Sequence, residues 1–200
     1  MRIGEKKVGE AIKDIKKGQP IKKRDIGATK VSLRPAITAD CELLWNLRND
    51  PNVRESAFET GFIPYEHHVK WFNKRLNSED VKIFIVQDQN LRPVGQIRFD
   101  IGDDGCAEID ISINSAERGK GYGTTALKKA CVIGLEDLHI KKFVAHIKTG
   151  NKASILVFSK AGFSRAGTKK VNGSVAVEMC LENIKELPVD NDLGDDIEDT

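Results

Sequence analysis

Residues 118–123 read RGKGYG, a stretch in which three glycines alternate with two basic residues and a tyrosine. Before it, AEIDISIN (107–114) alternates apolar and polar residues, which predicts a strand with one buried face. After it, TTALKKACVIGLEDL (124–138) has the apolar spacing of an amphipathic helix. A strand-to-helix junction exposes backbone N–H groups at the positive end of the helix dipole. With Arg118 and Lys120 adding charge, the sequence predicts an anion-binding loop.

The spacing of the glycines excludes some classes of anion-binding loop. A nucleotide P-loop needs GxxxxGK followed by Ser or Thr, and 118–124 does not have that spacing. A dinucleotide-binding loop needs GxGxxG in a βαβ unit and an acidic residue about 20 positions later, and the sequence meets neither condition. A tight turn with incidental Arg118 and Lys120 remains the alternative.

The remaining sequence alternates between expected strands and helices. Strands are expected at 31–35, 81–87, 93–101, 107–114 and 141–147, followed by a final hairpin that turns at Asn172-Gly173. Helices are expected at 38–50 with Thr38 as the cap, from Pro64 onward, at 124–138 and at 151–163. Most strands are joined by hairpins, and two helices cross over after RGKGYG. The sequence therefore predicts a single α/β domain with a mixed sheet.

The composition indicates a globular protein with charged ends of opposite sign. The 200 residues are 40% hydrophobic and 31% charged, with a net charge of +2. Residues 1–30 contain ten Lys or Arg and four acids, whereas 182–200 contain eight acids and one Lys. We expect both ends to be solvated. A nucleic-acid partner is not expected, because no aromatic residue is interleaved with the lysines of the basic end.

The four cysteines, Cys41, Cys106, Cys131 and Cys180, are scattered and form no metal-ligand pattern. They indicate reduced thiols, hence a cytoplasmic protein without a metal. The sequence shows neither the h-region of a signal peptide nor an apolar run of about 18 residues, so no membrane partner is expected. The oligomeric state is not determined, and a homodimer remains open.

Two motifs together resemble a known superfamily. The pattern RxxGxG (118–123) after a mid-sheet strand resembles the pyrophosphate loop of the GNAT superfamily of acyl-CoA N-acyltransferases. NxxS (151–154) followed by KAGF (160–163) resembles the same superfamily at the same separation from the loop. The resemblance covers roughly 31–181 and implies that the chain is an N-acetyltransferase.

Further stretches resemble one branch of this superfamily more closely. They are RNDPNVR (48–54), YEHHVKWF (65–72) and VGQIRFDI (94–101). The branch includes ribosomal-protein N-terminal acetyltransferases and the aminosugar-nucleotide N-acetyltransferases of bacterial nonulosonic-acid pathways, and HxKWF (68–72) favours the aminosugar side. IKKGQPIKKRDI (15–26) resembles the antifreeze-like domain of sialic-acid-type synthases and points to the same pathway.

The resemblance implies one GNAT domain at 30–181, between a basic extension at 1–29 and an acidic tail at 182–200. Its mixed central sheet would be splayed at the acetyl-CoA site and flanked by helices. Acetyl-CoA would be the co-substrate, without a metal. The residues implied for its pyrophosphate are Arg118, Gly119, Lys120, Gly121, Tyr122, Gly123 and Thr124. Those implied for its pantetheine are Ile111, Ser112 and Ile113, with the Ile113 amide as oxyanion donor, and Asn151, which could equally cap a helix.

The expected chemistry needs a base and an acid, because the acceptor must attack as a neutral amine and CoA must leave as a thiol. Glu108 matches a position that often carries an acid in this superfamily, so we prefer it as the base over Asp110 on the same face. A solvated strand face or a water chain are the alternatives. Many members use a tyrosine as the acid, but Phe158 stands at that position here. Ser154 is the expected substitute, unless its hydroxyl only bonds the helix start.

We expect the acceptor to lie between the first helices and the sheet. The candidates there are Trp45, Arg48, Asn49, Arg54, His68 and Trp71. The two arginines suit an anionic acceptor such as a nucleotide diphosphate. The alternative for the two tryptophans and His68 is a place in the core. The favoured acceptor is the 4-amino group of a UDP-linked dideoxy aminosugar; the alternatives are a protein N-terminus, another small amine, or a CoA-binding module without catalysis.

Overall fold

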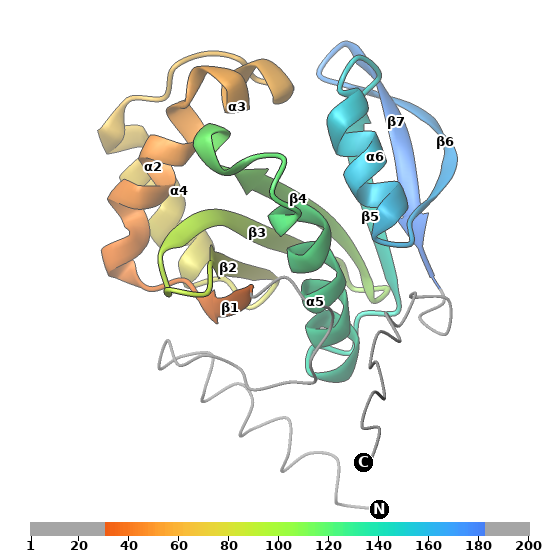
Figure 1. Ribbon diagram of the computed structural model, residues 1–200, viewed down its shortest axis with the longest axis horizontal. Coiled ribbons are helices and arrows are strands. Elements are labelled where there is room, and N and C mark those ends of the chain that lie inside the picture. Colours follow the sequence, from red (N-terminus) through yellow and green to blue (C-terminus); the bar gives the residue numbers. More distant parts are fainter. Residues whose placement is uncertain (1–30, 183–200) are drawn as a thin grey trace, which may run out of the picture.

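The computed structural model describes residues 31–182 (Figure 1). The basic extension and, apart from Glu182, the acidic tail fall outside this part of the chain. Within it, seven strands form one sheet in the order β1-β2-β3-β4-β5-β7-β6. The strands are β1 (Ser32–Pro35), β2 (Val81–Gln87), β3 (Pro93–Ile101), β4 (Cys106–Ile113), β5 (Lys142–Lys148), β6 (Ser164–Val171) and β7 (Ser174–Leu181).

The described α-helices are α2 (Cys41–Asn49), α3 (Pro51–Ser56), α4 (Tyr65–Leu76), α5 (Tyr122–Glu136) and α6 (Lys152–Lys160). Two 3-10 turns, η1 (Thr38–Asp40) and η2 (Ser115–Glu117), precede α2 and α5. The sequence did not predict α3, which is too short to show a helical repeat. Its start is nevertheless well defined, because Asp50 accepts hydrogen bonds from the N–H groups of Asn52 and Val53.

The predicted cap at Thr38 is wrong. Thr38 begins the 3-10 turn η1, and the polar group that organises this corner is the buried carboxylate of Asp40. Asp40 accepts a hydrogen bond from the Ile37 N–H at 2.8 Å and pairs with Arg34 at 2.6 Å. The chain therefore enters α2 through an ion pair with β1, which no local capping pattern could indicate.

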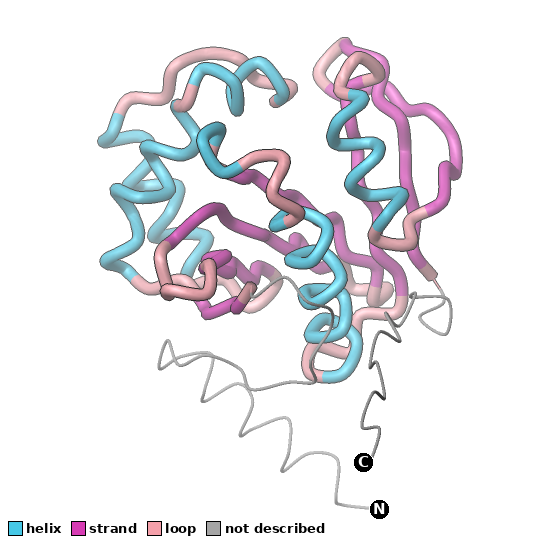
Figure 2. Tube along the Cα trace, viewed as in Figure 1, coloured by secondary structure: helices cyan, strands magenta, loops and turns pink. Residues whose placement is uncertain are grey.

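Helices cover both faces of the sheet (Figure 2). α5 and α6 enclose the larger core on one face. α2 and α4 pack on the other, where Phe72 is fully buried against residues of β2. α5 lies so close to β5 that a Cβ on Gly134 would stand 2.7 Å from the Phe143 ring. This tight packing fixes α5, and with it the loop before α5, against the sheet.

The sheet opens between β4 and β5. β4 pairs with antiparallel β3 along Ala107–Ile113, but it pairs with parallel β5 only over Cys106–Glu108. Beyond Glu108 the two strands separate, which leaves one edge of β4 without a strand partner. This splay confirms the fold that the resemblance implied.

Two further observations concern the whole described part. Among residues 31–182, no helix has the length and apolar character needed to cross a membrane. The thiols of all four cysteines are free.

Candidate active site

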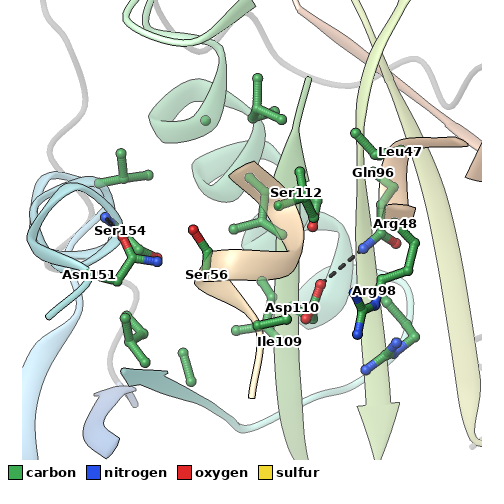
Figure 3. A pocket seen from close by; sticks show the side chains of 18 of the residues that line it. Leu47, Arg48, Ser56, Gln96, Arg98, Ile109, Asp110, Ser112, Asn151 and Ser154 are labelled. Carbon is green, nitrogen blue, oxygen red and sulfur yellow. Dashed lines mark hydrogen bonds between the residues drawn. The ribbon is translucent and has the colours of Figure 1, made fainter. Parts of the chain in front are cut away.

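A cleft of about 940 Å³ crosses the molecule at the splay. One side, called here the donor side, is formed by the loop 117–124, the end of β4 and α6. The other, the acceptor side, is formed by α2, α4, the segment 56–59 and the outer face of β3 and β4. Figure 3 shows Asn151 and Ser154 on one side facing Arg48, Gln96 and Arg98 on the other. The cleft thus joins the two regions that the sequence assigned to donor and acceptor.

The start of α5 provides the anion-binding groups of the donor side. Gly121 occupies the N-cap position with φ 82°, and no side chain in residues 31–182 caps this helix. Gly119 also has a positive φ of 79°, and the space where its Cβ would stand is open. The first N–H groups of α5, from Tyr122 to Thr124, therefore face the cleft without a side-chain acceptor. Such a cradle of N–H groups fits a diphosphate.

The two basic residues of the loop have different places. Arg118 lines the cleft and donates from Nε to the Ile113 carbonyl oxygen at 3.2 Å, so it fixes the end of β4. Lys120 is outside the lining and pairs with Glu117 at 2.7 Å. The backbone, rather than the lysine, is thus the main anion-binding element of the loop.

The edge of β4 offers N–H groups to the splay. The Asn114 N–H donates to the Val94 carbonyl at 2.9 Å, which marks a hydrogen-bonded pair of the β3–β4 ladder. Because such pairs alternate along an antiparallel ladder, the N–H groups of Ile111 and Ile113 point away from β3. They face the gap towards β5, where a thioester carbonyl could accept a hydrogen bond. Gly95 lies opposite Ile113, where a Cβ would stand 2.4 Å from the Ser112 carbonyl oxygen, so only glycine fits there.

α6 completes the donor side with two polar residues. Asn151 caps the helix, since its Oδ1 accepts from the Ser154 N–H at 3.1 Å, and both residues line the cleft. The capping role predicted as an alternative for Asn151 is therefore present in the structure. Phe158 is buried with its ring against Phe163, at a centroid distance of 5.0 Å. Ser154 is thus the hydroxyl that α6 presents to the cleft.

The acceptor side is lined by opposite charges. Asp110 accepts a hydrogen bond from Gln96 at 2.9 Å (Figure 3). Arg98 donates to Asp100 at 2.7 Å and lies over the Trp71 ring, 5.7 Å from its centroid. Trp71 lines the cleft and keeps 38% of its surface exposed, so it is not a core residue.

Arg48 has an incomplete set of partners. Its Nη2 donates to the Glu59 carbonyl oxygen at 2.7 Å, whereas Nη1 is buried without a hydrogen-bond partner among residues 31–182. Burial lowers the pKa of the Arg48 guanidinium, and the nearby charge of Asp110 opposes that effect. Arg48 lines the cleft, so its guanidinium borders the space that an acceptor would enter.

Other residues expected to contact the acceptor have supporting positions. Trp45 donates to the Ile63 carbonyl at 2.8 Å, and the Asn49 amide makes two hydrogen bonds with the Ile63 backbone, at 2.9 and 3.0 Å. Neither lines the cleft, and neither does Arg54. Trp45 and Asn49 instead hold the segment that brings Glu59 to the cleft. His68 touches the cleft but is buried, with Nε2 3.1 Å from the Cys41 carbonyl oxygen, and burial lowers its pKa.

Glu108 lies next to the cleft rather than in its lining. Its carboxylate contacts Nδ1 of His146 at 3.0 Å, and Nε2 of His146 contacts Glu178 at 3.1 Å. His146 and Asp110 both line the cleft. His146 was not expected at the site, although its alternation with Ala145 and Ile147 places it on the face opposite the core.

The comparisons with known proteins agree with this geometry. Residues 30–164 match the family model described as Acetyltransferase (GNAT) domain. YwnH of Bacillus subtilis strain 168, named a putative phosphinothricin acetyltransferase, is 31% identical over 143 residues, 68% of this chain and 86% of the relative. The spermidine N(1)-acetyltransferase of Vibrio cholerae is 23% identical over 141 residues, 70% of this chain and 82% of the relative.

Solved structures share the fold. Spermidine N-acetyltransferase from Vibrio cholerae in complex with CoA and spermine superposes with a TM-score of 0.69, at 22% identity, over 76% of this chain and 95% of that one. AAC(6')-Ib in complex with an aminoglycoside and acetyl-CoA also gives 0.69, at 23% identity, over 77% and 94%. The chain therefore belongs to the GNAT acetyltransferase family and is an acetyl-CoA-dependent N-acetyltransferase.

Proposed function

We propose that the protein transfers an acetyl group from acetyl-CoA to the 4-amino group of a UDP-linked dideoxy aminosugar. The observation that carries this acceptor is the Arg48 guanidinium at the wall of the cleft, whose Nη1 has no hydrogen-bond partner among residues 31–182. A buried N–H group without an acceptor costs about 1–3 kcal/mol, and a ligand oxygen would remove that cost. A phosphate oxygen suits a guanidinium particularly well, because the bond is charge-assisted.

The rest of the acceptor side supports the same class of ligand. The half-exposed ring of Trp71 offers an apolar face to a sugar or a base, and Asp110 offers an acceptor to hydroxyl or amino groups. A fully protonated polyamine has no lone pair for Arg48, so it would leave that N–H open. An acceptor that combines an amine with an anionic group therefore fits this cleft better than a polyamine.

The residues of the chain then have distinct roles. The donor supplies its acetyl group as a thioester, with its diphosphate on the N–H groups at the start of α5. Glu108 takes one proton from the acceptor ammonium, so that the neutral amine can form the C–N bond. The Ile113 N–H stabilises the negative charge that develops on the carbonyl oxygen. The C–S bond breaks, the attacking nitrogen gives up its second proton, and Ser154 passes this proton to the departing thiolate.

The test is the release of free thiol from acetyl-CoA with a set of amines. We expect kcat/KM for a UDP-4-amino-4,6-dideoxy-N-acetylhexosamine to exceed that for spermidine, phosphinothricin or a peptide N-terminus. In Arg48→Ala this kcat/KM should fall about 10- to 100-fold, as for a lost hydrogen bond to a charged group, with an unchanged Kd for CoA. The control is Arg165→Ala, on the exposed strand β6 outside the cleft. If the protein has a higher kcat/KM for spermidine or the peptide, and Arg48→Ala leaves kcat/KM unchanged, the proposed acceptor is wrong.

A further inference from the structure

Three titratable side chains from three strands meet at the base of the splay. Glu108 on β4 and Glu178 on β7 contact the two ring nitrogens of His146 on β5, at 3.0 and 3.1 Å. The His146 side chain is 7% exposed, whereas that of Glu108 is 55% exposed. This Glu108–His146–Glu178 cluster therefore has a shielded centre and one carboxylate open to solvent, and His146 lines the cleft.

The hydrogen-bond chemistry of this cluster requires a proton. A carboxylate can only accept hydrogen bonds, and a neutral imidazole carries a single N–H to donate. If His146 is neutral and gives that N–H to Glu178, its other nitrogen turns a lone pair towards Glu108. The second contact becomes a hydrogen bond only when one more proton lies between Glu108 and His146. The geometry thus has a place for one shared proton between Oε1 of Glu108 and Nδ1 of His146.

We propose that His146 and Glu178 are positioning residues that turn Glu108 into an effective proton acceptor for acetyl transfer. The acceptor ammonium loses one proton to Glu108, directly or through one water. That proton is then shared between Oε1 of Glu108 and Nδ1 of His146, while Glu178 holds the other ring N–H. After the C–N bond forms, the exposed side of Glu108 returns the proton to solvent.

Several further charged side chains surround the cluster. Asp110 stands two residues further along β4 on the same face, and Arg98 on β3 interacts with Asp110 and Glu108. Lys148 follows on the same face of β5, but its Nζ donates to the Glu55 carbonyl oxygen at 3.0 Å. Arg98 brings a positive charge near Glu108, whereas Asp110 and Glu178 bring negative charges. His146 is the group of the cluster that can share the arriving proton through a direct contact.

The experiment is the pH dependence of kcat/KM in His146→Gln, Glu108→Gln and Glu178→Gln. At pH 7 we expect His146→Gln to lose about 100-fold, the lower range for general base catalysis. The deficit should narrow towards pH 9.5, because the amine is then increasingly neutral without help. Glu178→Gln should show a smaller loss with the same pH trend. The Kd for CoA should stay that of the unaltered protein, and His139→Asn, an exposed histidine outside the cleft, is the control.

The proposal rests on the proposed role of Glu108 but not on the identity of the acceptor, because any amine that supports thiol release can be used. If Glu108→Gln is slow while His146→Gln and Glu178→Gln keep the original profile, the positioning role is overturned and the base remains. If all three variants keep the pH profile of the original protein, the assignment of Glu108 as the base fails as well. A loss in His146→Gln that is equal at every pH would show a merely structural role. Should His146→Gln not fold, Glu178→Gln decides by the same criteria.

Discussion

On the donor side of the cleft, the polar groups that face the cleft are mostly backbone N–H groups at the start of α5 and at Ile113 on β4. On the acceptor side they are side chains of α2, α4, β3 and β4, such as Arg48 and Asp110. Backbone groups are fixed by secondary structure and change little with sequence. Side chains can be replaced one at a time while the fold persists. The same fold can thus keep one donor and change its acceptor.

The largest effect is expected from a substitution that disturbs the backbone of the donor side. Gly121→Glu puts a side chain at φ 82° and a negative charge in the diphosphate cradle, so affinity for CoA should fall about 100-fold or more. Isothermal titration calorimetry with CoA measures this affinity. The control is Gly105→Glu, which has a similar φ of 79° in the turn between β3 and β4. Equal affinity in Gly121→Glu and the original protein would refute the loop assignment.

The next effect separates chemistry from binding within the donor side. Ser154→Ala should lower kcat about 100-fold, as for a lost general acid, while the Kd for CoA stays nearly constant. Single-turnover kinetics with saturating acetyl-CoA measure the chemical step. Ser159→Ala, on the exposed side of α6, is the matched control. An unchanged rate in Ser154→Ala would remove this serine from the mechanism.

A smaller effect is expected from a substitution that weakens the acceptor side and leaves the donor side unchanged. Asn49→Ala removes both hydrogen bonds to the Ile63 backbone, so the segment that carries Glu59 should become less ordered. We expect KM for the amine to rise about tenfold, the value of one to two net hydrogen bonds, with CoA affinity unchanged. Asn73→Ala on the exposed face of α4 is the control. A parallel loss of CoA affinity would show that the two sides are not independent.

The smallest effect concerns the hydrogen bond that joins the two sides. The Ser115 hydroxyl donates to Asp50 at 2.8 Å, and this bond, with the N–H groups of α3, holds the pKa of Asp50 below its ordinary value. Asp50→Ala should therefore lower Tm at pH 7 by about 2–4 °C, as for the loss of a helix cap.

The pH dependence of this stabilisation has a definite sign. Because the pKa of Asp50 is depressed in the folded state, its contribution is complete above the ordinary aspartate range near 4 and is lost as the pH falls through the depressed value. The Tm difference between Asp50→Ala and the original protein should thus shrink as the pH falls below the ordinary aspartate range. Asp103→Ala in an exposed turn is the control. A difference that persists at low pH would mean that the carboxylate charge is not involved.

The fold around the donor side could be predicted from the sequence because its determinants are local. RGKGYG lies next to its strand and its helix, so spacing alone located the N–H cradle, and the resemblance added the splay. The acceptor side was predicted less completely. Arg48 and Trp71 do line the cleft, but Trp45 and Asn49 instead hold Ile63, because the segment before α4 folds back in a way that no periodicity encodes.

The contacts of His146 also could not be predicted from the sequence. Its two partners lie 38 and 32 residues away along the chain, and they meet it because β5 lies between β4 and β7. A single histidine in an alternating strand gives no sign of such partners. Only the strand order brings Glu108, His146 and Glu178 together.

The most direct test of the account is a crystal structure of the protein with acetyl-CoA bound. We predict that the diphosphate accepts hydrogen bonds from the N–H groups of 119–124. We also predict that the thioester carbonyl points into the splay within hydrogen-bonding distance of the Ile113 N–H. A diphosphate bound elsewhere, or a thioester outside the gap between β4 and β5, would contradict the account.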